Sequence, residues 1–286
     1  MSGAASSSAR PSRMRARDLL TWWPALLLGA LLVAAIFAPW LAPMDPDRQN
    51  LLARLKAPGF EARGAVYWLG SDELGRDVLS RLIHGARVSI SVAVLSVLLS
   101  GVVGVTVGML AGYLRGWTET VLMRLVDIFL SIPAILLAII TVAVLGPGFV
   151  NVILVLALTR WPRYARVAYG QTLAMADRPF VQLSRAMGAS TPRVLAVHIL
   201  PNIIGPLVVV ATLEFGLMVL FEAGLSFLGL GVQPPMASWG AMLSTGRNYI
   251  ATAWWIATFP GLALFLLVLS ANLIGDTLGD RIGKER

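Results

Sequence analysis

Six predominantly apolar stretches, each long enough to cross a lipid bilayer, constrain the fold more than any other feature of this sequence. They cover residues 19–44 and about 89–113, 121–145, 149–169, 202–225 and 253–275. A helix needs about 20 such residues to span roughly 30 Å of hydrocarbon. We therefore expect an all-α membrane protein with six transmembrane helices.

The composition agrees with a chain that is surrounded by lipid. Hydrophobic residues make up 57% of the sequence and charged residues only 13%, against roughly 25% charged residues in soluble domains. The net charge of +8 does not indicate a nucleic-acid partner, because the arginines lie between apolar stretches and no nucleic-acid-binding motif occurs. The sequence has no cysteine, and His84 and His198 lie far apart with no other histidine nearby, so we predict no metal site.

The basic residues predict how the helices are oriented. Most of them lie in segments that are cytoplasmic if both chain ends are inside, as the positive-inside rule requires. The first apolar stretch exceeds the roughly 7–15 residues of a signal-peptide core, so we expect it to be retained. The expected order is a disordered cytoplasmic tail (1–18), the first helix (19–44), an extracytoplasmic loop (45–87), five further helices (88–280) and a cytoplasmic tail (281–286).

Two of the apolar stretches carry a further pattern. Gly104, Gly108 and Gly112 recur every four residues, so they form a stripe on which another helix can approach closely. In the fifth stretch Glu214, Met218 and Glu222 share one helical face. Acidic groups in a bilayer face protein or water. This face is predicted either to line a translocation path or to pair with an arginine, a backbone donor or a partner chain.

A polar segment at about 177–201 separates the fourth and fifth apolar stretches. Pro179 suits the first turn of a short helix, which we expect Asp177 to cap and Gly188 to end in a left-handed conformation. Phe180, Leu183 and Met187 then fall on one face. A second short helix is expected with Thr191 as its cap, and Pro201 is expected to open the next span. Such a segment can lie on the lipid surface or dock into a cytosolic partner.

The segment resembles the cytoplasmic loop of ABC-importer permeases, whose pattern is Glu-Ala-Ala, three residues, Gly, nine residues, Ile, any residue, Leu-Pro. Gly188, Leu200 and Pro201 match that pattern, whereas Gln182, Leu183 and Ser184 replace the triplet and His198 the isoleucine. Further resemblance to permeases for dipeptides, oligopeptides and nickel lies in "LGSDELGRDVLSRLIHGARVSI", "MRLVDIFLSIPAILLAI", "WPRYARVAYGQTLAMADRPFV", "EAGLSFLGLGVQPPMASWGAML" and "NLIGDTLGD". The five segments keep their order over most of residues 69–280, and the chain is most similar to the second, C-type permease subunit.

The resemblance implies an ABC importer type I permease fold and a place in the bacterial inner membrane. It implies a heterodimer with a homologous permease, two cytosolic ATPases and an extracytoplasmic binding protein that delivers di- or oligopeptides. Permeases for nickel or glutathione are the alternative within the same family. The resemblance places ATPase coupling in a loop at about 170–201, with these contact residues: Phe180, Gln182, Leu183, Ser184, Met187, Gly188, Ala189, Leu200 and Pro201.

The residues themselves exclude ATP hydrolysis by a P-loop in this chain. Neither of its two lysines, Lys56 and Lys284, lies in a Walker A motif, so we expect ATP and Mg²⁺ on partner subunits and no cofactor here. No cluster of nucleophile, base or metal ligands indicates an enzyme. An ion-coupled secondary transporter is the more distant alternative, for which an inverted repeat would be expected.

Overall fold

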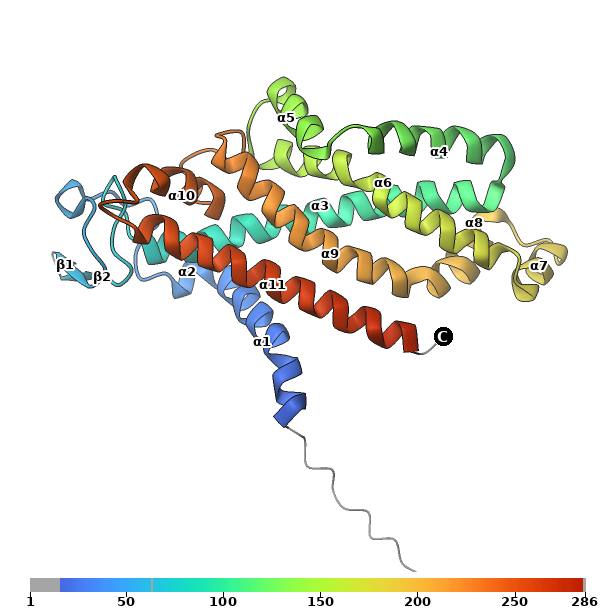
Figure 1. Cartoon of the computed structure of the whole chain (residues 1–286), viewed down its shortest axis with the longest axis horizontal. Helices are drawn as coiled ribbons and strands as arrows, with labels where there is room; N and C mark the ends of the chain where they lie inside the picture. The colour runs from blue at the N-terminus through green and yellow to red at the C-terminus, as the bar shows by residue number, and fades with distance from the viewer. Residues whose placement is uncertain (1–15, 63, 285–286) are drawn as a thin grey trace, which may run out of the picture.

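Long helices that run side by side form the body of the protein (Figure 1). The computed structural model describes residues 16–62 and 64–284. The long helices are α1 (Ala16–Ile36), α3 (Val78–Leu114), α6 (Phe149–Ala176), α9 (Leu200–Phe227) and α11 (Trp255–Lys284). Within these ranges, residues 78–114, 191–227 and 255–280 form helices long and apolar enough to cross a membrane. The helix α6 is less apolar, because Arg160, Arg163 and Arg166 lie near its middle.

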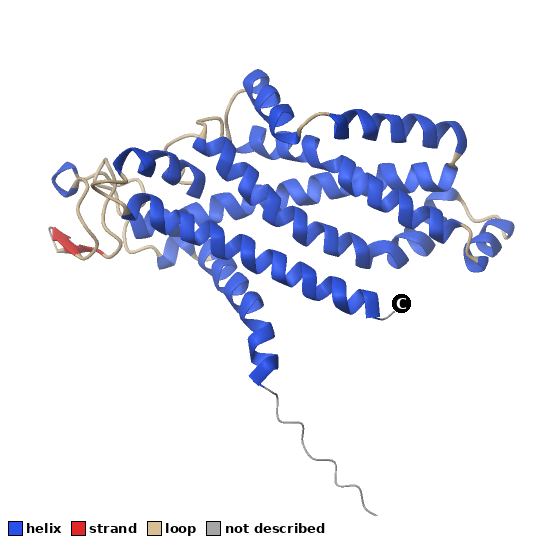
Figure 2. Ribbon diagram, in the orientation of Figure 1, coloured by secondary structure: helices blue, strands red, loops and turns tan. Residues whose placement is uncertain are grey.

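Short elements gather at the two ends of this body. The loop-rich end holds α2 (Ala38–Leu41), η1 (Leu51–Ala53), β1 (Phe60–Ala62), β2 (Ala65–Tyr67), α10 (Trp239–Gly246) and η3 (Arg247–Tyr249). The strands pair antiparallel, with Phe60 opposite Tyr67 and Ala62 opposite Ala65. The opposite end, the α7 end, holds α7 (Pro179–Ala186), α8 (Thr191–Arg193) and η2 (Val194–Ile199). Figure 2 shows how little of the described chain is strand.

The glycine stripe lies where α3 packs against α6. A Cβ on Gly104 would lie 2.6 Å from Tyr164 Cβ, and one on Gly112 would lie 2.9 Å from Thr172 Cβ. At Gly108 a Cβ would meet Ala168 Cβ at 2.8 Å and would lie still closer to the carbonyl oxygen of Ala165. The three glycines therefore set how closely the two helices approach.

The start of α3 is fixed by a polar network at the loop-rich end. The Asp77 carboxylate accepts a hydrogen bond of 2.8 Å from the backbone N–H of Ser80, so the helix begins at Val78. Upstream, Arg76 donates to Asp72 at 2.6 Å and to Glu73 at 2.8 Å. Burial, and then the neighbouring Asp72, raise the pKa of Glu73 above its ordinary value.

One predicted span is not a continuous helix. The 121–145 stretch divides into α4 (Gly116–Ser131) and α5 (Ala134–Leu145), which are bent by 90°. Ile132 between them is extended, with φ −94° and ψ 128°. Pro133 explains the break, because proline disfavours helix at the residue before it and has no N–H to donate.

Other helix boundaries in the structure also differ from the predicted ones. The first helix ends at Ile36 instead of extending to residue 44, and α2 follows it. At the α7 end, α8, η2 and α9 continue as one helix, so Pro201 lies in the first turn of α9 without breaking it. Helix α11 continues to Lys284, into the predicted 281–286 tail. The predicted 1–18 tail lies almost wholly outside the described residues.

Candidate functional site

The α7 end presents an apolar surface. On α7 the side chains of Leu183 and Phe180 are 61% and 43% exposed, and Met187 immediately after the helix is 75% exposed. The opposite face, with Val181 and Ser184, is buried against the body. Exposed apolar side chains on a short helix are typical of a surface that another element covers. We call Phe180, Leu183 and Met187 the α7 surface.

Local sequence explains the shape of this helix. Pro179 occupies its first turn, where a missing N–H costs little. Gly188 has φ +86°. The Gly188 N–H donates to the carbonyl oxygen of Arg185 at 2.9 Å, and the Ala189 N–H donates to the carbonyl oxygen of Ser184 at 3.1 Å. These two bonds form a Schellman motif, which requires the left-handed conformation that glycine adopts freely.

The predicted capping residues have other positions. The residue before α7 is Arg178, and the residue before α8 is Ser190; neither side chain caps its helix. Asp177 instead accepts a hydrogen bond of 2.8 Å from Arg115, at the junction of α3 and α4. The prediction that Asp177 and Thr191 act as caps was therefore wrong.

Three contacts hold α7 against the body. The first is the Arg115–Asp177 pair, and in the second the Arg185 guanidinium lies 5.1 Å from the centre of the Tyr113 ring. In the third, Phe180 packs edge-on against His198 of η2, with 6.4 Å between ring centres. The first two contacts join the α7 segment to the C-terminal end of α3. The sequence analysis identified neither Tyr113 nor Arg115.

The remaining predicted loop residues divide between surface and interior. Gln182 is exposed, and its amide donates to the Asp177 carbonyl at 3.3 Å. Ala189 and Leu200 are half-buried and pack on the apolar cluster beneath α7. Pro201 is exposed at the first turn of α9.

Glu214, Met218 and Glu222 all point into the protein. Each has at most 2% of its surface exposed. Glu214 lies 3.7 Å from Arg160 and 3.6 Å from Arg163, both on α6. The structure thus contains the arginine pairing that the sequence left open for Glu214.

Glu222 lies in a cluster of serines that joins three helices. Ser89 of α3 donates to one carboxylate oxygen at 2.9 Å, and Ser226 of α9 donates to the other at 2.7 Å. Ser238, before α10, donates to the Ser226 hydroxyl at 3.3 Å. Ser89 in turn accepts from the backbone N–H of Trp239 at 3.3 Å. Glu222 therefore has hydrogen-bond donors for both of its oxygens within this chain.

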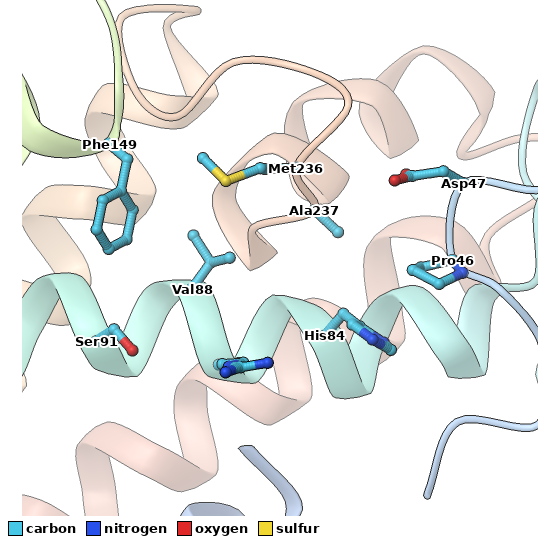
Figure 3. Close-up of a pocket in the computed structure, with 9 residues that line it drawn as sticks. Pro46, Asp47, His84, Val88, Ser91, Phe149, Met236 and Ala237 are labelled. Atoms are coloured by element: carbon cyan, nitrogen blue, oxygen red, sulfur yellow. The ribbon is translucent and has the colours of Figure 1, made fainter. Parts of the chain in front are cut away.

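A cavity of about 410 Å³ opens at the loop-rich end (Figure 3). His84, Val88 and Ser91 of α3 face it on one side, and Met236 and Ala237 on another. The Nδ1 atom of His84 lies 3.0 Å from the Ser80 carbonyl oxygen, so one of its ring nitrogens is occupied. This cavity is far along α3 from the α7 surface.

Comparison with protein families gives two matches. Residues 104–284 match the family described as binding-protein-dependent transport system inner membrane component. Residues 22–58 match the N-terminal TM domain of oligopeptide transport permease C.

Curated relatives are similar over nearly the whole chain. A di/tripeptide transport system permease protein of Pseudomonas aeruginosa is 45% identical over 90% of this chain and 85% of its own length. A probable D,D-dipeptide transport system permease protein of Escherichia coli is 41% identical over 91% of this chain and 86% of its own length. A glutathione transport system permease protein of Pectobacterium atrosepticum is 40% identical over 88% of this chain and 82% of its own length.

Among solved structures, the MetNI methionine ABC transporter in an inward-facing conformation is similar with a TM-score of 0.55. The likeness covers 69% of this chain and 94% of that chain at 23% identity, and it supports the same helical fold.

Proposed function

Because the chain belongs to the family of binding-protein-dependent transport system inner membrane components, we propose that it forms half of the path through an ATP-driven importer of di- and oligopeptides. As a member of this family it is a non-catalytic, multi-pass subunit in the bacterial inner membrane. The names of its relatives support the peptide class, because they transport di/tripeptides, D,D-dipeptides and glutathione, which is itself a tripeptide.

The proposed topology has six passes with both ends in the cytoplasm. The bent pair α4–α5 counts as one pass, together with α1, α3, α6, α9 and α11. The α7 end is then cytoplasmic, and the loop-rich end faces the binding protein. The basic residues at the α7 end, Arg115, Arg178, Arg185 and Arg193, agree with this orientation.

The observation that carries the coupling proposal is the exposed α7 surface. In the complete importer it would sit in a groove on an ATPase subunit, as an amphipathic helix does in a partner's groove. A homologous permease would supply a second such helix, and two ATPases would bind and hydrolyse ATP with Mg²⁺. Movement of α7 would pass to α3 through Arg115 and Tyr113 and would tilt the helices as packed bodies.

We expect Leu183→Asp to weaken ATPase binding strongly, because it places a charge at the centre of the α7 surface. Truncating an apolar hot spot costs about 2 kcal/mol or more, which is roughly a thirtyfold loss in affinity. The measurement is the yield of ATPases that co-purify with the tagged chain from membranes. Leu98→Asn, at a side chain 58% exposed on the apolar face of α3, is the control and should leave co-purification intact. Normal ATPase recovery with Leu183→Asp would contradict docking at α7.

Gly188 gives a second test of the same helix. A Cβ at Gly188 meets nothing within 4 Å, so only backbone strain opposes substitution. Gly188→Val is expected to distort the end of α7 and to reduce peptide uptake about tenfold, because a β-branched residue rarely adopts positive φ. Gly188→Asn should retain most uptake, since asparagine tolerates that conformation. Equal uptake by the two variants would show that the left-handed turn is unimportant.

A further inference from the structure

Two faces of the helical body differ in the side chains they expose. The outer face of α3 exposes only apolar groups over two turns and more: Leu95, Leu98, Leu99, Val102 and Val103. On the other face, formed by α4, α6 and α9, the charged side chains of Asp127, Arg163 and Arg166 are about half exposed. The first face suits lipid. The second requires protein or water, because exposed charges do not face hydrocarbon.

Arg163 lies deep within this second face. Helix α6 has 28 residues and is therefore about 42 Å long, and Arg163 is about 21 Å from its first residue, Phe149, at 1.5 Å per residue. Its side chain is nevertheless 59% exposed. An arginine halfway along a spanning helix with its guanidinium uncovered marks a water-filled or protein-covered site.

A cavity of about 390 Å³ lies at Arg163. Leu130 of α4, Arg163 and Arg166 of α6, and Leu213 and Glu214 of α9 line it, together with two valines. Arg166 is paired with Asp127. Three guanidinium groups, those of Arg163, Arg166 and the adjoining Arg160, therefore face two carboxylates, so one positive charge remains uncompensated among these five groups.

The pairing inside the cavity is also incomplete. Arg163 Nη1 is 3.6 Å from Glu214, and Arg160 Nη1 is 3.7 Å from it, both beyond hydrogen-bond length. Within the described chain, the buried Glu214 Oε2 and Arg160 Nε atoms have no hydrogen-bond partner. Arg163 thus keeps most of its five N–H donors free in a planar array that matches a carboxylate.

We propose that this cavity is a carboxylate-binding station on the translocation path, in which Arg163 contacts the C-terminal carboxylate of a passing peptide. Glu214 holds Arg163 in place, and Asp127 neutralises Arg166, so that one cation is available for one anion. The looseness of the site suits a path, because a transported solute has to leave it again. The proposal rests on the peptide-importer function and adds the chemical group that this chain recognises.

The test uses the complete importer in proteoliposomes and the absence of cysteine from this chain. Leu213→Cys places one thiol on the wall of the cavity. The variant is treated separately with two methanethiosulfonate reagents, the negatively charged sulfonatoethyl reagent and the positively charged trimethylammonioethyl reagent. The reaction rate of each reagent with the introduced thiol is divided by its rate with a free thiol in solution. We expect the anionic reagent to react about tenfold faster, because the excess positive charge concentrates anions. A dipeptide with a free C-terminus should slow the labelling more than its C-terminal amide does.

Leu99→Cys on α3 is the matched control, because Leu99 and Leu213 are both 38% exposed. It should react with neither charged reagent. The faster reaction of Leu213→Cys with the anionic reagent should disappear when Arg163→Gln is added. It should persist with Arg163→Lys, because lysine keeps the positive charge. The lysine variant also keeps the test usable if the glutamine variant folds poorly. Any of three results would overturn the proposed station: no labelling of Leu213→Cys in any nucleotide state, equal reaction rates for the two reagents, or a preference for the anionic reagent that survives Arg163→Gln. Failure of the importer function itself would show separately, as ATPases that do not co-purify.

Discussion

Replacing Gly108 by alanine is expected to destabilise the protein, although alanine is the better helix former. The gain in helix propensity is at most about 1 kcal/mol. Against it, the new Cβ would lie 2.8 Å from both Ala168 Cβ and Tyr169 N, and closer still to the Ala165 carbonyl oxygen. Two of these atoms belong to the backbone of α6, which cannot move without shifting the whole helix. We expect a net loss of about 2 kcal/mol for Gly108→Ala and a larger loss for Gly108→Val.

Gly101 provides the control on the same helix. A Cβ at Gly101 would meet the Tyr164 ring at 3.7 Å, which is ordinary contact. Gly101→Ala should therefore be neutral or slightly stabilising. The measurement is the apparent Tm of the purified complex in detergent, followed by size exclusion after heating. A drop of about 5 °C for Gly108→Ala and none for Gly101→Ala is expected. Equal Tm values for the two variants would show that α3 and α6 are not in close contact at Gly108.

Local patterns in the sequence were enough to predict the α7 surface and its end. Phe180, Leu183 and Met187 recur at helical spacing, and Gly188 follows where a left-handed residue is needed. Both features depend on neighbours within a few residues, which the sequence displays directly. The glycine stripe is equally local, although its partner helix could not be read from it.

Pro133 predicts a bend in the third apolar stretch, but the sequence does not show that the helix breaks there. The second half of the 121–145 window carries no charge, and a proline inside a membrane helix often causes only a kink. Here Ile132 is extended and the chain turns by 90°. The composition is the same for a kink and for a break, so tertiary packing decides between them.

The polar contacts of the site could not be predicted from the sequence, for a different reason. Arg115 and Asp177 are 62 residues apart, and Ser89 and Glu222 are 133 apart. Nothing local joins such pairs. From the sequence, Arg160, Arg163 and Arg166 count only as basic residues for the positive-inside rule. The fold places all three near the middle of α6, with Arg160 and Arg163 beside Glu214 and Arg166 beside Asp127.

Glu222→Leu is expected to destabilise the protein by about 3 kcal/mol. The carboxylate is fully buried and accepts from Ser89 of α3 and Ser226 of α9. Leucine has a similar volume but no acceptor, so both hydroxyls lose their partner in the interior, at about 1–3 kcal/mol each. Part of this loss is recovered, because a serine in a helix can donate to the carbonyl one turn earlier. The link between α3, α9 and α10 is not recovered, and the start of α10 at Trp239 should loosen.

Two further variants separate the lost hydrogen bonds from the substitution itself. Glu222→Gln keeps one acceptor oxygen and should cost about 1 kcal/mol. Glu61→Leu makes the same change at an exposed position on β1 and should alter stability by less than about 0.5 kcal/mol. Resistance of the complex to heat and to protease is measured for all three variants. If Glu222→Leu were as stable as Glu61→Leu but changed the uptake of charged relative to neutral peptides, Glu222 would act in the translocation path and the structural role argued for it would be wrong.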